Sequence, residues 1–192
     1  MGSHVYGISY VAAALILLHG FMYWVVKDQR LGGSESRGKF VPMASAERHR
    51  LVLDMTSIAN SFILCVLYVK GMQDLGGSAV ERLTGTSANS HLGNVLLGAI
   101  ALYEVFIYAL TYDKRVAVWV HHLCVLFFVF FCLATGRLAY YQCWGGLVEG
   151  TNLFLCTLTI QKRLGFTVHW FVGVGTQGFL LSIPQVIPAV HP

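Results

Sequence analysis

The chain has 192 residues, of which 56% are hydrophobic and 11% charged, with a formal net charge of +4 and a mean hydropathy of +0.63. A soluble domain carries about 25% charged residues, so this composition excludes an ordinary water-soluble globular protein. The apolar residues form long blocks and not the ~10-residue alternating segments of a membrane β-barrel. The sequence therefore predicts an all-α, polytopic membrane protein, because a helix satisfies its own backbone polar groups in lipid.

Apolar blocks of 18 or more residues are typical of transmembrane helices, and we expect about six of them in one domain that occupies residues 1–192. In chain order, the approximate ranges are 5–26, 51–69, 92–112, 116–135, 138–160 and 166–190. The second block is the weakest, because polar residues such as Asp54 and Asn60 interrupt it. The first block lacks preceding Lys or Arg residues and an A-x-A-like site, which favours a membrane helix over a cleaved signal peptide.

Two long connections separate these spans. The first, LGGSESRGKFVPMASAERHR, ends in SAERHR, which either extends the second helix or lies along the membrane interface. The second, GMQDLGGSAVERLTGTSANS, is rich in Gly, Ser and Thr, and its AVERL segment predicts one short amphipathic helix. Neither connection has the composition of a folded soluble domain.

The basic residues are unevenly distributed between the two sides of the membrane. Connections 27–50, 113–115 and 161–163 hold ten of the 13 Lys and Arg residues, and the opposite connections hold three. The positive-inside rule places the first set in the cytoplasm, or in the matrix or stroma of an organelle. Both termini then lie on the opposite side. Topology accounts for the positive charge, so we expect no nucleic-acid partner.

Ionisable side chains inside the predicted spans lie in one half of the membrane. Such residues cost about 2.5–3.5 kcal/mol on insertion scales and usually face the interior of a bundle. Counted at about 1.5 Å per residue, seven of them lie in the half of the membrane next to the positive connections: His19, Asp54, Glu104, His121, His122, Glu149 and His169. Together with Asn152, one turn from Glu149, they predict a polar, lipid-accessible cavity. A single pair of these residues also has a structural explanation, in which it only holds two helices in register. The pairs considered are Glu104 with His121 and Glu149 with His122.

The fifth predicted span supports a cavity, because it carries a stripe of small and polar side chains. At helical spacing they share one face: Gln142, Gly145, Glu149, Asn152, Cys156 and Thr159. Gly146 and Gly150 beside it form a GxxxG pattern, which permits close helix packing. The five cysteines all lie inside predicted spans, so no disulfide framework is expected.

Residues 100–165 resemble the TLC-domain family, named after the translocating-chain-associating membrane proteins and the ceramide synthases. The resemblance consists of Tyr112-Asp113-Lys114-Arg115 before a helix with paired histidines, then Glu149-Gly150-Thr151-Asn152-Leu153-Phe154 and a basic end, Gln161-Lys162-Arg163. It implies a TLC-like helical bundle that encloses a lipid-accessible cavity. It also implies that His121 and His122 are the acid/base residues if the protein transfers acyl groups. The chain departs from the synthases at Leu123, which follows the histidine pair, and at Gly150, which stands where they have an acid.

These departures favour a non-catalytic protein, an accessory subunit of a larger membrane complex with bound phospholipid. Its partners would be membrane lipids and other membrane-protein subunits. The alternative is a lipid-handling protein, either an acyl-CoA-dependent acyltransferase or a regulator of membrane phospholipid composition. The subunit hypothesis favours an organellar energy-converting membrane such as the mitochondrial inner membrane, and the family resemblance favours the endoplasmic reticulum.

A haem protein is a third hypothesis, because His19, His169 and one residue of the pair lie at similar depth. Adjacent residues point about 100° apart on a helix, so only one of His121 and His122 can ligate a given iron. We expect neither haem nor a metal ion in this protein.

Overall fold

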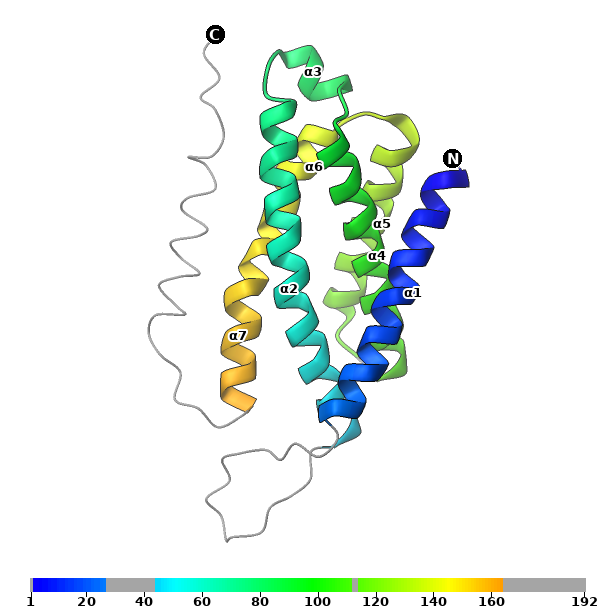
Figure 1. Ribbon diagram of the computed structural model, residues 1–192, viewed down its shortest axis with the longest axis vertical. Helices are drawn as coiled ribbons and strands as arrows, with labels where there is room; N and C mark the ends of the chain where they lie inside the picture. The colour runs from blue at the N-terminus through cyan, green and yellow to red at the C-terminus, as the bar shows by residue number, and fades with distance from the viewer. Residues whose placement is uncertain (1, 27–43, 112–113, 164–192) are drawn as a thin grey trace, which may run out of the picture.

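The computed structural model describes residues 2–26, 44–111 and 114–163, and within them the chain is helical with no strand (Figure 1). The predicted span 166–190, including His169, lies outside the described residues. In chain order the elements are α1 (Gly2–Val25), α2 (Ser45–Asp74), α3 (Ala79–Thr84), α4 (Ala88–Leu110), α5 (Val116–Thr135), α6 (Ala139–Gly146), the 3-10 helix η2 (Leu147–Thr151) and α7 (Asn152–Arg163).

Within the described residues, four stretches are long and apolar enough to cross a membrane: Tyr6–Val25, Ser45–Asp74, Ala79–Leu110, which contains α3 and α4, and Val116–Thr135. They coincide with the first four predicted spans. The predicted all-α class is therefore confirmed for the described residues, with four stretches that could span a membrane.

Helix α2 begins at Ser45, so the SAERHR segment extends the second helix, one of its two predicted positions. The Ala44 amide donates to the Glu47 carboxylate at 3.4 Å and helps to begin the helix. The polar residues that weaken this span in the sequence are buried inside the bundle, among them Ser57, Asn60 and Ser61. Their polarity reflects an interior position rather than a break in the helix.

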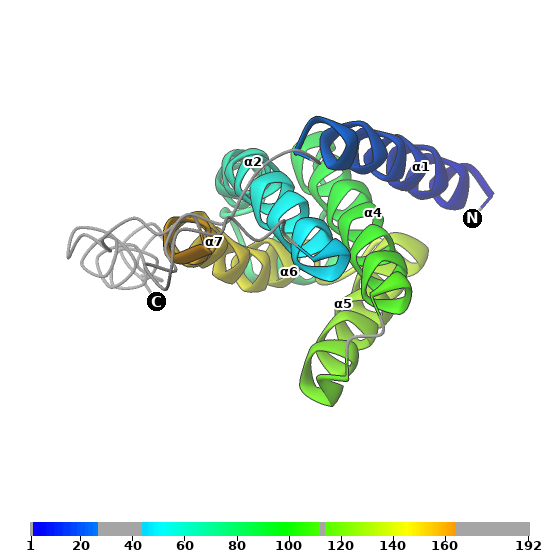
Figure 2. The same cartoon turned by 90° about the horizontal axis from the view of Figure 1, so that it is seen from below.

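Helix α4 lies at the centre of the bundle and packs against α1, α2, α5 and α6 (Figure 2). The apolar core lies mainly between α2 and α4 and includes Leu64, Tyr68, Tyr103 and Ile107. Helix α7 packs on α2, whereas α5 packs on α4 and α6 and leans away from α7. The bundle therefore diverges where α5 begins.

The prediction of one continuous α-helix over 138–160 is corrected by the structure, which has α6, η2 and α7 in this range. Three glycines in this range lower its helical propensity. The buried Tyr68 ring packs directly on Gly146, where an added Cβ would lie 2.7 Å from Cδ2 of Tyr68. The 3-10 turn follows at once and carries Glu149.

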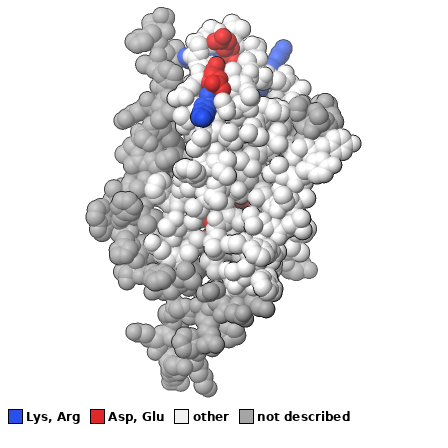
Figure 3. Space-filling view, in the orientation of Figure 1, with Lys and Arg blue, Asp and Glu red and all other residues white. Residues whose placement is uncertain are grey.

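We call the end where α1, α4 and α7 finish and α2 and α5 begin the cavity end, and the opposite end the α3 end (Figure 1). On the face in Figure 3, the charged side chains gather near the α3 end, and the long sides of the helices are almost uncharged. Large apolar side chains such as Leu17, Phe62 and Phe127 are exposed on those sides. This distribution fits helices whose sides face lipid.

Candidate functional site

A cavity of about 330 Å³ lies between α2, α4, α5 and the η2–α7 segment. It lies in the half of the bundle next to the cavity end, because its lining residues are near the beginning of α2 and α5 and near the end of α4. The lining consists of Leu53, Asp54, Ser57, Glu104, Tyr108, Ala117, Val118, His121, His122, Glu149, Asn152 and Cys156.

The structure brings six of the eight predicted cavity residues together: Asp54, Glu104, His121, His122, Glu149 and Asn152. His19 is not among the lining residues and belongs to a second cluster, and His169 lies outside the described residues. Ser57 and Tyr108 also line the cavity and were not predicted. Helical spacing was the available signal, since each lies one turn beyond a predicted residue on its own helix.

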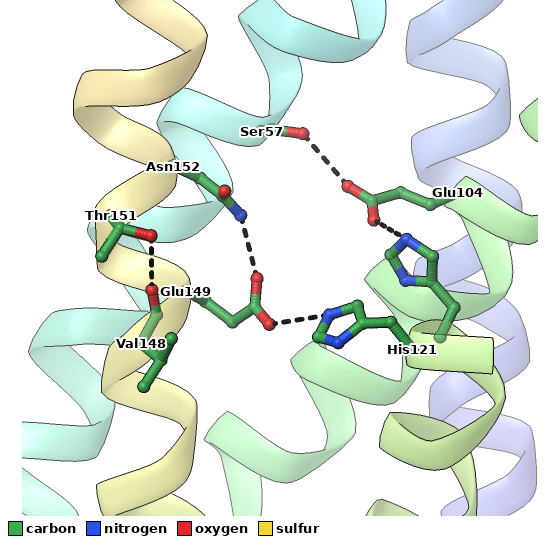
Figure 4. A network of polar contacts seen from close by, with 8 residues as sticks. Ser57, Glu104, His121, Val148, Glu149, Thr151 and Asn152 are labelled. Carbon is green, nitrogen blue, oxygen red and sulfur yellow. Dashed lines mark hydrogen bonds and ion pairs between the residues drawn. The ribbon is translucent and has the colours of Figure 1, made fainter. Parts of the chain in front are cut away.

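The first histidine–acid pair of the cavity is buried and joins three helices. His122 Nε2 on α5 lies 3.2 Å from Glu104 Oε2 on α4, and the Ser57 hydroxyl on α2 donates to Glu104 Oε1 at 3.1 Å (Figure 4). The two side chains of the pair are only 10% and 11% exposed. Both carboxylate oxygens of Glu104 therefore have partners, as a buried polar group requires.

The second pair is more open. His121 Nε2 lies 3.4 Å from Glu149 Oε1, and the Asn152 amide donates to Glu149 Oε2 at 2.9 Å (Figure 4). The side chains of His121 and Glu149 are 55% and 22% exposed. The 3-10 turn positions this pair, because it places Glu149 opposite α5 with Asn152 beside it.

The pairing is the reverse of the one considered from the sequence, which joined Glu104 to His121 and Glu149 to His122. Because α5 packs on α4, the residue on the packed face, His122, meets Glu104. The preceding residue, His121, points about 100° away around the helix, and it faces the η2–α7 segment. The two rings lie edge to face, with centroids 5.1 Å apart.

The cavity has a definite chemical character. Three of its lining side chains are carboxylic acids and two are imidazoles, and none of the described lining residues is Lys or Arg. Such a lining favours a cationic or an uncharged hydrogen-bonding group over a phosphate, which would face the carboxylates. Within the described part of the chain, no group of three or more His, Cys, Asp and Glu side chains is arranged to hold a metal ion.

A second polar cluster fastens α1 to the bundle. The Thr56 hydroxyl on α2 lies 3.0 and 2.9 Å from the carbonyl oxygens of Val52 and Leu53, to which it can donate. The Tyr103 hydroxyl on α4 lies 3.0 Å from Thr56 Oγ1 and 2.7 Å from His19 Nδ1 on α1. His19 Nε2 lies 2.9 Å from His49 Nδ1 on α2, so the cluster joins three helices.

We expect Tyr103→Phe to destabilise the protein by about 1–2 kcal/mol, because it leaves His19 Nδ1 and Thr56 without their shared partner. Thermal unfolding in detergent would measure the effect. The matched control is Tyr141→Phe at an exposed position on α6, which should change the midpoint little. Equal shifts for the two variants would contradict a structural role for the cluster.

No protein-family model, no curated protein and no solved structure matches this chain. Function is therefore inferred from the geometry of the cavity, where two histidine–carboxylate pairs meet between α4, α5 and η2.

Proposed function

We propose that this protein binds a membrane lipid, with the polar headgroup in the cavity, and acts as a non-catalytic accessory subunit of a larger membrane complex. The observation that carries the lipid-binding proposal is the convergence of two histidine–carboxylate pairs on one cavity of about 330 Å³ inside the helical bundle. Polar groups at such depth are costly unless they have partners. A polar headgroup would supply partners for the exposed side of His121.

The route into the cavity is expected to be sideways from the bilayer. The cavity is lined by α5 on one side and by the η2–α7 segment on the other, where His121 Nε2 lies 3.4 Å from Glu149 Oε1. Among the described helices, α5 packs mainly on α4 and α7 mainly on α2. A lipid tail can remain among the apolar, exposed side chains on the outside of α5, such as Leu123 and Phe127. The resemblance of residues 100–165 to TLC domains supports the same arrangement.

The headgroup chemistry follows from the lining. Asp54, Glu104 and Glu149 oppose an anionic group, whereas an ammonium or hydroxyl group can donate to them. A phosphate, where the lipid has one, would lie toward the cavity end, near the Arg and Lys residues that flank α2 and α5 in the sequence.

Acyl transfer is the second candidate, and the exposure of His121 favours it. An imidazole whose Nε2–H donates to a carboxylate keeps its lone pair on Nδ1, and this nitrogen can take a proton from an attacking amine or hydroxyl. His121 has its carboxylate partner at 3.4 Å and half of its side chain open. His122 is enclosed and paired, which suits a structural role.

The lipid proposal predicts that His121→Ala lowers the amount of lipid that co-purifies in mild detergent. Loss of one hydrogen bond to a charged group costs about 1.5–3 kcal/mol, so we expect roughly tenfold weaker retention or more. Leu17→Ala, at an exposed position on α1 away from the cavity, is the control. Mass spectrometry of the extracted lipid gives the readout. Equal retention by both variants, or a protein that carries no stoichiometric lipid, would sink the proposal.

The native particle mass tests the accessory role separately. A particle of hundreds of kilodaltons with fixed partners is the expected result, and a monomer or dimer that carries only lipid would contradict it. Transfer of an acyl group from acyl-CoA to a lipid amine or hydroxyl, lost in His121→Ala, would instead establish the second candidate.

A further inference from the structure

Helix α3 has an unusual distribution of side chains for an exposed connection. It is six residues long and lies over the end of the bundle, between the end of α2 and the beginning of α4 (Figure 1). None of its residues is buried. Its two large apolar side chains, Val80 and Leu83, are 68% and 47% exposed and lie three residues apart, on one face.

The charged side chains of α3 lie on the opposite face and are engaged by the protein itself. Glu81 Oε2 accepts the Ser78 amide at 2.9 Å in a capping box. Arg82 donates to the Gly76 carbonyl at 2.9 Å, and its guanidinium lies over the Tyr140 ring, 5.4 Å from the centroid. A helix lying against a soluble core does the reverse, with its apolar side chains inward and its charges in water.

Helix α3 is also held in place. The Leu138 amide in the α5–α6 turn donates to the Leu83 carbonyl at 2.9 Å, and Leu138 has a positive φ of 61°. Its exposed face is thus a fixed part of the surface rather than the side of a loose loop.

The neighbouring surface indicates what covers this face. The stretch Ala79–Leu110, which can cross a membrane, begins with α3 and continues through α4. Helix α3 thus lies at the end of this stretch and next to the end of α2, where the chain would leave the lipid. Helix α3 packs against α6, whose Tyr141 and Trp144 are each 46% exposed. Aromatic side chains of this kind are enriched at the membrane–water interface.

We propose that α3 is a membrane-surface anchor, whose Val80 and Leu83 insert into the headgroup region of the bilayer at the α3 end. The anchor is independent of the ligand cavity, which lies at the other end of the bundle. The charged residues at the end of α2, in α3 and in the α5–α6 turn are of both signs: Lys70, Asp74, Glu81, Arg82 and Arg137. They nearly cancel, so we expect the contact with the bilayer to depend on the apolar side chains. Zwitterionic lipid is therefore sufficient for insertion.

The test uses the full chain in phosphatidylcholine nanodiscs, with a genetically encoded nitroxide side chain at position 80, 83 or 81 in turn. We expect nitroxides at 80 and 83 to be several-fold more accessible to oxygen, which partitions into lipid, than to an aqueous nickel chelate. Position 81 lies on the opposite face, is the control, and should be more accessible to the nickel chelate than to oxygen. A label at this position leaves the helix cap in place, because the backbone amide of residue 81 donates to the Ser78 hydroxyl at 3.1 Å.

Two results would overturn the anchor. Equal access of the nickel chelate to positions 80, 81 and 83 would place the whole helix in water. Protection of positions 80 and 83 from both relaxing agents would show that a protein surface covers them.

Discussion

Replacement of Gly146 by alanine is expected to destabilise the protein by about 1–3 kcal/mol, the usual cost of overpacking a filled interior. The added Cβ would overlap the ring of Tyr68, which is fully buried and also contacts Gly93 on α4. Neither ring nor backbone can move freely, because the Tyr68 hydroxyl donates to the Gly93 carbonyl at 3.2 Å. The midpoint of thermal unfolding in detergent would measure the loss.

The adjacent glycine provides the control for this prediction. A Cβ added at Gly145 meets no atom within 4 Å. Because alanine favours a helix over glycine by about 1 kcal/mol, Gly145→Ala should be neutral or slightly stabilising. The double variant Gly146→Ala/Tyr68→Leu should lose less unfolding free energy than the sum of the losses of the two single variants, because the shorter side chain relieves the overlap. Similar losses for the two glycines would show that general helix packing, and not the Tyr68 contact, dominates.

His122→Ala is expected to be the most damaging change in the cavity, with a loss of at least about 2 kcal/mol of unfolding free energy. It removes the 3.2 Å partner of Glu104 and leaves a buried carboxyl group with Ser57 alone. His121→Ala should cost less than about 1 kcal/mol, because its side chain is 55% exposed and Glu149 keeps the Asn152 amide. Reversible unfolding in detergent or bicelles would measure both losses.

The neighbouring histidines are thus expected to separate stability from ligand binding. His122→Ala should lower the unfolding midpoint, and His121→Ala should lower lipid retention at nearly unchanged midpoint. His122→Asn is an additional check, since a side chain that can still donate should recover part of the loss. If both alanine variants lower the midpoint equally, the division of roles between the two pairs is wrong.

The sequence was sufficient to predict four stretches that could span a membrane and six of the twelve residues that line the cavity. Long apolar blocks are a local property, so the first four spans could be located without tertiary information. Depth along a helix is also local at about 1.5 Å per residue, which is why six of the predicted residues line one cavity. His19 shares that depth but lies elsewhere in the bundle, because depth says nothing about which neighbour a side chain faces.

The partners of the polar side chains were decided by tertiary structure. The rotation of α5 against α4 determines that His122 meets Glu104 and His121 meets Glu149. The break at Gly146 depends on a tyrosine 78 positions earlier in the chain, whose ring fills the space that a Cβ would need. Both are long-range packing effects. The pairing has no signal in local composition or periodicity, and the glycines of 138–160 lower helical propensity without showing where the helix ends. The sequence by itself determined helices that are long and apolar enough to cross a membrane, with ionisable residues gathered in one half of them. Only the folded bundle decided which of these residues form pairs and which histidine stays exposed, because that depends on how the helices pack on one another.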